Sequence, residues 1–359
     1  MATLFLCGDV MTGRGIDQIL PHPGDPRLHE RWARSATRYV ELAEKANGPI
    51  GAPRDFAYIW GDALDELERR APDARIANLE TAVTTCDEAW PDKAIHYRMH
   101  PRNVPCLAAA RIGCCVLANN HVLDWGRPGL AETLAVLHAD GIRTAGAGAE
   151  AREARSVAAI ELPGAARVLV VAAAAQTSGV PREWEAQPQR SGVNLVGDLS
   201  PAAAKALARS AAASRKPGDI LLASIHWGGN WGYEIAPAER IFAHALVDEG
   251  VDVVHGHSSH HAKGIEIYRG RPILYGCGDF VNDYEGIDGE EQYRGDLRLM
   301  YFVDIDARDG VANIDVVTMR ARRMRLERAP AEATAWIAAM LRREGRRFDT
   351  LPSQVRVAP

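Results

Sequence analysis

Long apolar runs, a surplus of positive charge and paired cysteine motifs are all missing from this 359-residue sequence. No apolar segment approaches the roughly 18 residues of a membrane-spanning helix, so we expect no membrane partner. The formal net charge of -5 removes the electrostatic basis for binding nucleic acid. Apolar residues make up 47% and charged residues 25%, as in ordinary globular proteins, which excludes collagen-like, coiled-coil and disordered chains.

The cysteines show no CxxC spacing, and most of them lie in apolar segments that are typical of buried strands. Adjacent Cys114 and Cys115 would point to opposite faces of a strand, which is a poor basis for a disulfide. We interpret the cysteines as small buried side chains in a reducing compartment; thiolate catalysis, the alternative, would need an electropositive loop. The first ten residues lack the basic segment of a signal peptide, so we expect a cytoplasmic protein.

Short apolar runs alternate with helical patterns along the chain, which predicts an α/β fold with ligands beyond the carboxyl ends of its strands. Ser200 and Pro201 form a clear helix start, with a cap residue before a proline. We expect strands at 3–7, 75–78, 114–118, 167–173, 220–226, 252–256, 272–276, 299–305 and 312–317, and helices at 60–70, 128–140, 201–215 and 238–249.

We expect one main domain at 1–318, with an insertion at 19–57 that lies over the mouth of its active site. That this domain is catalytic and metal-dependent is implied by the family resemblance described below. A C-terminal extension at 319–359 is rich in arginine, which raises the alternative of a nucleic-acid patch. Because 331–343 is amphipathic, a helix packed on the domain is the better interpretation.

Polar residues that can bind a metal or transfer a proton follow six of the predicted strands. Parallel strands end at the same edge of a sheet, so we expect these residues to converge although they are far apart in the sequence. Histidine, carboxylate and carboxamide groups at one point are ligands for a divalent cation. The six segments are GDVMTGR (8–14), NLE (78–80), NNHVLD (119–124), HWG (226–228), GHSSHH (256–261) and GDF (278–280).

In this order and spacing, the segments resemble the CapA-type proteins, which are named for poly-γ-glutamate capsule synthesis and have the calcineurin-like metallophosphoesterase fold. The resemblance covers about residues 3–305. It implies a four-layer α/β sandwich, in which two central β-sheets are flanked by helices and the site lies at their shared edge. Soluble CapA-like proteins that tailor ribosomal peptides, including epimerases of lasso-peptide pathways, are one branch that the sequence resembles.

The resemblance also implies roles for individual residues. The implied metal ligands are Asp9, Glu80, Asn120, His226 and His257, with Glu80 at the bridging position. The implied catalytic residues are His121, for proton transfer, and His260, which approximates a last ligand although GHSSH is one residue longer than the family spacing. Asp124 lies three residues after His121 and would orient its imidazole, and Asp279 would pair with a histidine of the 257–261 loop.

One departure from the family pattern bears on the metal. Phosphoesterases of this fold have a histidine two residues after the first aspartate, where this sequence has Met11. The remaining set is rich in oxygen and favours one hard cation such as Ca²⁺, Mg²⁺ or Mn²⁺, while a binuclear site stays open. Phosphoryl transfer by two metals is then disfavoured.

Three functions remain for such a site. The first is metal-assisted acid/base chemistry on a peptide or amino-acyl substrate, most sharply inversion of an α-carbon by a peptide epimerase, because the histidines and aspartates supply a base and an acid. The second is hydrolysis of a phosphoester, and the third is a capsule-associated protein without catalysis. For substrate binding we predict Arg14, facing a terminal carboxylate, with Trp227 and Trp231; the alternatives are an ion pair and ordinary packing. The oligomeric state is left open.

Overall fold

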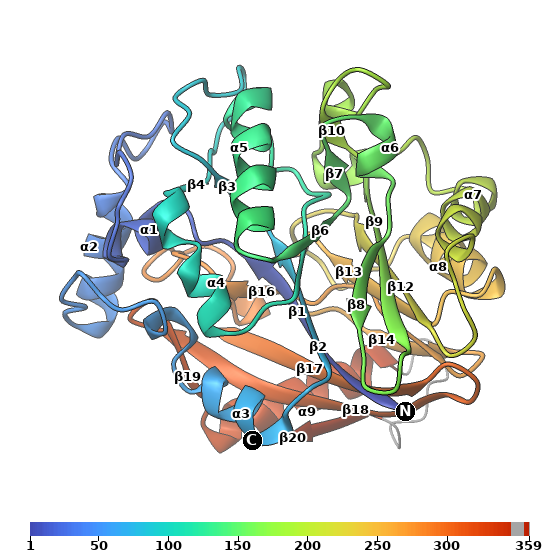
Figure 1. The fold of residues 1–359 in the computed structure, drawn as a ribbon. Coiled ribbons are helices and arrows are strands. Elements are labelled where there is room, and N and C mark those ends of the chain that lie inside the picture. Colours follow the sequence, from blue (N-terminus) through green and yellow to red (C-terminus); the bar gives the residue numbers. More distant parts are fainter. Residues whose placement is uncertain (346–354, 359) are drawn as a thin grey trace.

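The computed structural model describes residues 1–345 and 355–358, which fold around two β-sheets (Figure 1). The first sheet is built around β1, a nine-residue buried strand of the sequence ATLFLCGDV. Its order is β19-β18-β17-β1-β2-β5-β6, with β16 beside β1 and β20 beside β18. These strands are β1 (Ala2–Val10), β2 (Ala74–Leu79), β5 (Cys114–Val116), β6 (Arg143–Ala145), β16 (Asp279–Val281), β17 (Leu297–Asp306), β18 (Gly310–Arg322), β19 (Arg325–Arg328) and β20 (Val355–Ala358).

The second sheet has the order β11-β9-β12-β13-β15-β14, with β8 beside β9. Its strands are β8 (Ala158–Glu161), β9 (Arg167–Ala175), β11 (Leu195–Val196), β12 (Ile220–His226), β13 (Val253–His257), β14 (Ile265–Tyr268) and β15 (Arg271–Leu274). Two small ribbons pair β3 (Ala82–Val83) with β4 (Arg98–Met99) and β7 (Ala147–Gly148) with β10 (Gly192–Val193).

The helices are as follows. They are α1 (Gly15–Ile19), α2 (Thr37–Asn47), α3 (Ala63–Arg70), α4 (Pro105–Ala109), α5 (Gly126–Ala139), α6 (Ala151–Ala154), α7 (Pro201–Ala212), α8 (Pro237–Asp248) and α9 (Ala331–Gly345). As expected, α7 begins after Ser200, whose Oγ accepts a hydrogen bond from the backbone N–H of Ala203 at 3.2 Å. Among the described residues, no helix combines the length and apolar character that crossing a bilayer requires.

Alternation along β9 explains why the two sheets stack. Val168 and Val170 face the first sheet and join its core, whereas Leu169 and Val171 face the other way and pack with α7 and α8. Helices α3, α4 and α5 contribute apolar side chains such as Leu107 to the core that contains the first sheet. The chain therefore forms a helix–sheet–sheet–helix sandwich, and the expected four-layer α/β fold is confirmed (Figure 1).

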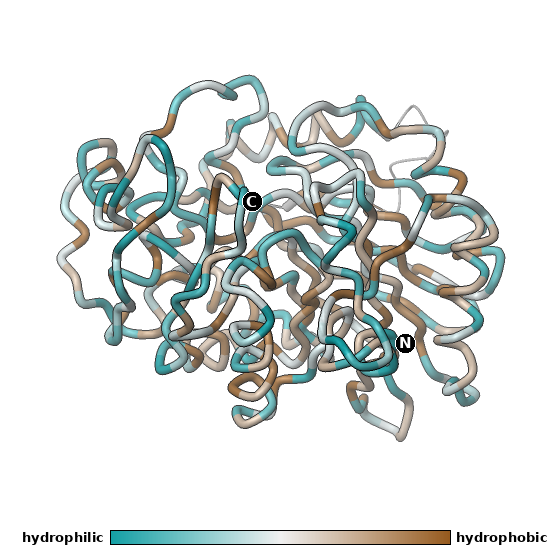
Figure 2. Tube along the Cα trace, turned by 90° about the horizontal axis from the view of Figure 1, so that it is seen from above, coloured by the Kyte–Doolittle hydropathy of each residue, from teal (hydrophilic) through white to brown (hydrophobic). Residues whose placement is uncertain are grey.

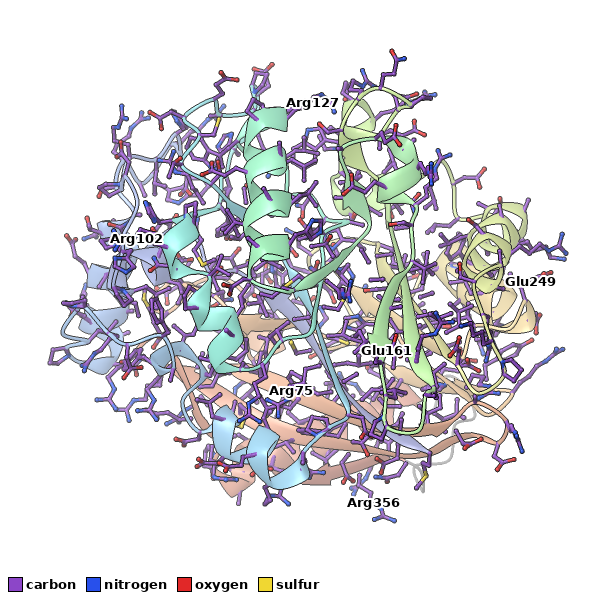
Figure 3. All side chains as sticks on the ribbon, viewed as in Figure 1. Arg75, Arg102, Arg127, Glu161, Glu249 and Arg356 are labelled. Carbon is purple, nitrogen blue, oxygen red and sulfur yellow. The ribbon has the colours of Figure 1, made fainter. Side chains whose placement is uncertain are left out.

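Hydropathy follows this layering. Hydrophobic segments gather in the interior of the molecule, and hydrophilic ones lie on the outer loops (Figure 2). Charged side chains such as Arg102, Glu161 and Arg356 are exposed at the periphery (Figure 3). The buried acids and histidines of the next section are thus exceptions that need a physical reason.

The predicted domain limits stay predictions, but the structure describes most of the segments concerned. Strand β18 runs through residue 318 without interruption, and α9 buries Ile337 and Met340 in the core. Arg346 and Arg347 of the arginine-rich extension lie outside the described residues. In the 19–57 insertion, α2 ends at Asn47, which lines a cavity described below.

Candidate metal centre and acid/base site

The predicted site lies where β1, β2, β12 and β13 end and where β16 begins, so both sheets contribute to it. Strand β1 pairs in parallel with β2 and β16, and β12 pairs in parallel with β13. Asp9 on β1 is in register with Asp279 on β16, and His226 is in register with His257. On β12 and β13, alternation turns both histidines toward the first sheet, because Ile225 and Val254 face the helices.

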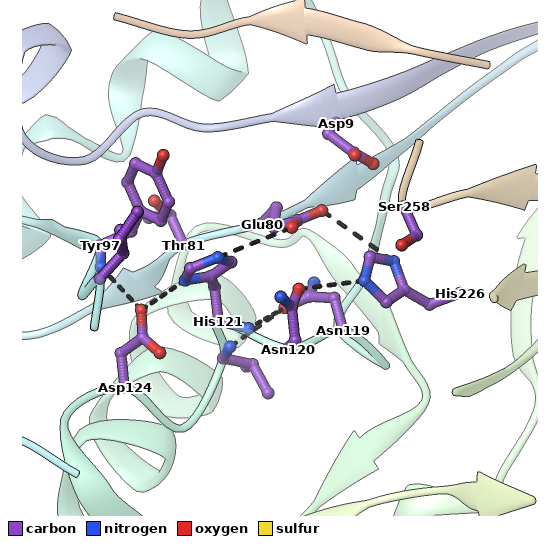
Figure 4. A network of polar contacts seen from close by, with 12 residues as sticks. Asp9, Glu80, Thr81, Tyr97, Asn119, Asn120, His121, Asp124, His226 and Ser258 are labelled. Carbon is purple, nitrogen blue, oxygen red and sulfur yellow. Dashed lines mark hydrogen bonds and ion pairs between the residues drawn. The ribbon is translucent and has the colours of Figure 1, made fainter. Parts of the chain in front are cut away.

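Two buried carboxylates form the centre of the site. Asn78 Nδ2 donates hydrogen bonds to Asp9 Oδ1 at 2.7 Å and to Glu80 Oε2 at 2.9 Å, which holds the two acids together. Asp9 Oδ2 is buried and has no hydrogen-bond partner. Burial and the neighbouring Asp279 raise the pKa of Asp9 to about 7. Burial and Asp9 raise the pKa of Glu80 well above its usual value. Figure 4 shows Asp9 and Glu80 side by side.

His226 and His257 face each other beside these acids. Their Nδ1 atoms lie 2.7 Å apart, and His226 Nε2 lies 3.0 Å from Asn120 Oδ1. Burial lowers the pKa of both imidazoles well below its usual value. Neutral imidazoles of this kind offer a lone pair to a metal.

A divalent cation fits these residues. Ligand atoms of Asp9, His226 and His257 all lie within 4.8 Å of one another, and so do those of Asp9, His260 and Asp279. Asp9 belongs to both groups and carries the unpaired Oδ2, so it is the residue that would be shared by two cations. The mixture of oxygen and imidazole donors suits several divalent metals. Glu80 was expected to bridge, but it belongs to neither group and lies 4.0 Å from His226 Nδ1.

The first His–Asp pair is His121 and Asp124. His121 Nδ1 lies 2.7 Å from Asp124 Oδ2, which also accepts from the backbone N–H of Tyr97 at 2.7 Å. Lys93 Nζ lies 2.6 Å from Asp124 Oδ1. Burial opposes ionisation of Asp124, but His121 and Lys93 outweigh it and keep the pKa of Asp124 below its usual value. Burial lowers the pKa of His121 to about 4, and its Nε2 lies 3.9 Å from Glu80 Oε1 (Figure 4).

The second His–Asp pair is His260 and Asp279. His260 Nδ1 lies 2.9 Å from Asp279 Oδ1, while Asn282 Nδ2 donates to Asp279 Oδ2 at 2.6 Å. Arg298 Nη2 in turn donates to Asn282 Oδ1 at 2.7 Å. Burial opposes protonation of His260, but Asp279 outweighs it and raises the pKa.

A cavity of about 420 Å³ opens beside this second pair. His260, Asp279 and Arg298 line it together with Trp231, which is 37% exposed. The first pair, by contrast, has no residue in this cavity. The cavity is therefore a space beside His260 and Asp279 that a substrate could enter.

Arg14 does not lie as predicted. It is 3% exposed, its Nε and Nη2 donate to Asp283, and its Nη1 donates to Glu30 at 2.8 Å and Tyr39 at 2.9 Å. With all three guanidinium nitrogens taken by internal partners, it forms a structural ion pair rather than a site for a substrate carboxylate. This correction has a simple reason, because Asp283 is 269 residues away in the sequence and no local pattern announces it.

The two tryptophans differ. Trp227 is 1% exposed, donates from Nε1 to the carbonyl of Tyr275 at 2.9 Å and packs in the core against Phe242, so its predicted role in substrate binding is corrected to packing. Trp231 lines the cavity and lies 5.3 Å from His260 between ring centroids. It keeps the predicted substrate-binding role as a prediction.

Sequence reasoning missed several polar residues that hold the site together. Asn78 was seen only as a neighbour of Glu80, and Asn119 Nδ2 donates to Asn78 Oδ1 at 2.9 Å. Lys93, Asn282 and Arg298 were not singled out at all. Arg298 carried a usable signal, because an arginine inside the apolar run LRLMYFV is unusual for a buried strand.

Comparisons with known proteins identify relatives of the chain. The family described as "Bacterial capsule synthesis protein PGA_cap" matches residues 3–284. A probable polyglutamine synthesis accessory protein of Mycobacterium tuberculosis is 49% identical over 350 residues, which are 97% of this chain and 92% of that protein. The PGA biosynthesis protein CapA of Bacillus subtilis is 28% identical over 247 residues, which are 68% of this chain and 60% of that protein.

Among solved structures, a 5'-nucleotidase precursor from Thermus thermophilus matches with a TM-score of 0.47 and 14% identity, over 94% of this chain and 57% of that chain. A likeness of this size carries no argument about activity.

Proposed function

The chain belongs to the PGA_cap family of bacterial capsule synthesis proteins, and we propose that it is a metal-dependent acid/base enzyme that acts on a peptide or amino-acyl substrate. The expected resemblance to CapA-type proteins is confirmed by this family match. The observation that carries the proposal is the placement of two His–Asp pairs at one cluster of metal-binding side chains.

The sharpest form of the proposal is inversion of an α-carbon. His121 contacts Glu80 and His260 groups with Asp9, so the two imidazoles flank the pair of acids that Asn78 holds together. One imidazole would remove the α-proton and the other would return a proton to the opposite face, so no oxidant is needed and atoms balance. A divalent cation held by Asp9, His226 and His257 would supply positive charge next to the carbonyl oxygen where negative charge develops.

The names of the relatives support the class of substrate. Polyglutamine, for which the relative from Mycobacterium tuberculosis is named, is a polyamide of amino acids. An amino-acyl unit of such a chain carries both the α-proton and the carbonyl that the proposed reaction requires.

A second candidate, phosphoester hydrolysis, is favoured by one observation. The two ligand groups share Asp9, as expected if two cations sit close together, and such pairs catalyse in-line displacement at phosphorus. The two candidates can be distinguished because a phosphoesterase would cleave a phosphodiester, whereas an epimerase would exchange the proton of an α-carbon with solvent.

The test combines metal content with two assays. The chain is purified without added metal beside Asp9→Asn, which keeps the shape of the side chain, and Asp17→Asn, a buried aspartate outside the site. Each is analysed for metals, then incubated in deuterated buffer with α-linked and γ-linked glutamyl peptides, and separately with bis(p-nitrophenyl) phosphate.

We expect bound metal in the wild type and Asp17→Asn but not in Asp9→Asn, with deuterium entering an α-carbon. Rapid phosphodiester cleavage without deuterium exchange would replace the proposal by the second candidate. Bound metal with neither reaction would favour an accessory protein without catalysis.

A further inference from the structure

A chain of hydrogen bonds leads from the candidate metal ligands into the contact between the two sheets. Ser224 on β12 lies in register with His255 on β13, and its Oγ is 2.9 Å from His255 Nδ1 and 2.9 Å from His257 Nε2. His255 Nε2 is 2.9 Å from the carbonyl oxygen of Cys7 on β1. The side chains of Ser224, His255 and His257 are fully buried.

When the imidazole rings are neutral, only one arrangement of protons gives every hydrogen bond from Cys7 through His255 and Ser224 to His257 one donor and one acceptor. Both ring nitrogens of His255 face uncharged partners, the hydroxyl of Ser224 and the carbonyl of Cys7, and this buried setting favours a neutral ring. A carbonyl oxygen only accepts hydrogen bonds, so His255 Nε2 carries the proton and His255 Nδ1 accepts. Ser224 then donates its single hydroxyl proton to His255, and its oxygen accepts from His257 Nε2. His257 is left with a lone pair on Nδ1.

The opposite imidazole is fixed in the same way. Asn120 Oδ1 accepts from His226 Nε2, which leaves the lone pair of His226 on Nδ1. The two lone pairs then face each other across 2.7 Å, within the group that includes Asp9. Two lone pairs repel at that separation unless a positive charge lies beside them.

We propose that Ser224 and His255 are positioning residues that fix the tautomer of His257, so that its Nδ1 lone pair is presented to a divalent cation. Hydrogen-bond partners of this kind commonly set the orientation and tautomer of metal-binding histidines. Without the Ser224 hydroxyl, a proton on His257 Nε2 has lost its acceptor, whereas a proton on Nδ1 can be donated to His226 Nδ1. The Nδ1–H tautomer is then favoured, and its proton would lie where the cation would bind.

The experiment measures the tautomer and the metal affinity separately. Metal-free chain labelled with ¹⁵N at histidine is examined by NMR, with His257→Gln to assign the resonance, and Mn²⁺ binding is measured by calorimetry. The variants are Ser224→Ala, Ser224→Thr, which keeps the hydroxyl, and Ser178→Ala. Ser178 is a matched control because it is buried and donates only to the carbonyl of Ala175 at 2.7 Å.

We expect His257 in the Nε2–H form in the wild type, Ser224→Thr and Ser178→Ala. In Ser224→Ala the Nδ1–H form should appear, and Mn²⁺ affinity should fall about tenfold, at the low end of the usual range for such partners. The proposal is overturned if the wild type shows the Nδ1–H form or if Ser224→Ala matches Ser178→Ala in both measurements. If Ser224→Ala does not fold, His255→Gln takes its place, with the same expected changes.

This inference rests on the metal site of the proposed function but not on its reaction. The wild type could show the expected tautomer and bind Mn²⁺ but catalyse no exchange at an α-carbon. That result would overturn the proposed reaction and still support the roles of Ser224 and His255 in fixing the tautomer of His257.

Discussion

His121 and His260 each place Nδ1 beside a carboxylate, at 2.7 and 2.9 Å, but the protein around the two pairs differs. Asp124 is held by the backbone N–H of Tyr97 and by Lys93, which both come from the separate 93–97 segment. Asp279 is held through Asn282 by Arg298, whose guanidinium comes from another strand. The first pair is thus fixed by the 93–97 segment, and the second by Asn282 and by Arg298 on β17.

The two pairs also differ in what they face. His121 is 8% exposed and packs edge-on against Tyr97, with ring centroids 4.5 Å apart. His260 lines the cavity with Trp231. The hydroxyls of Tyr97 and Tyr284 lie 2.7 Å apart and join the two sides of the site. We therefore expect the His121–Asp124 pair to be held rigidly by packing. The His260–Asp279 pair, which lines the cavity, forms the open half of the site, where we expect the substrate to be contacted also by Trp231.

The largest predicted effect comes from replacing either histidine, and the two replacements should affect opposite directions of the inversion. With a substrate identified by deuterium exchange, His121→Gln and His260→Gln should each slow inversion by about 10²–10⁴-fold, since each loses one proton-transfer group. Exchange of the α-proton should be lost from one enantiomer in one variant and from the other enantiomer in the other variant. It is measured by mass spectrometry on both enantiomers. Equal loss from both enantiomers in one variant and none in the other would show that a single histidine does all the proton transfer.

A smaller effect is expected when the support of the second pair is removed. Arg298→Met leaves Asn282 without its donor, so Asp279 loses its fixed orientation, and we expect the rate of exchange to fall about 10–100-fold. Arg294→Met is the matched control, because Arg294 also lines the cavity but bonds to Asp296 at 2.8 Å. Both variants are compared by initial rates and thermal unfolding. Similar rates in the two variants would mean that Arg298 does not position the pair.

The fold was largely predictable because its main elements carry local signals. The long buried strands β1, β9 and β12 are continuous apolar runs, and α7 has a cap residue and a proline at its start. The two-residue strands β3, β4, β7 and β10 carry no such signal. They exist only because distant segments meet, as Val83 and Met99 do.

The site was predictable to the extent that its residues follow strands. His226 ends a predicted strand, Asp9 and His257 lie within two residues after one, and the structure brings their ligand atoms together. Ser224, His255 and Arg298 lie inside strands, where alternation hides which face they occupy until the sheets are stacked. The partners of Arg14 come from three separate segments, so its role as an ion pair could only be read from the tertiary structure.

The smallest effect tests whether the open half contacts the substrate. Trp231→Ala removes a ring that stacks on Tyr293, with centroids 5.4 Å apart, and borders the cavity. Because an aromatic contact contributes about 0.5–1.5 kcal/mol, we expect KM to rise about threefold to tenfold while kcat changes little. Trp32→Ala, at a tryptophan that is 64% exposed and outside the cavity, is the control for loss of an exposed ring. A fall in kcat with unchanged KM would instead place Trp231 with His260 in proton transfer, because the ring then matters only after the substrate has bound.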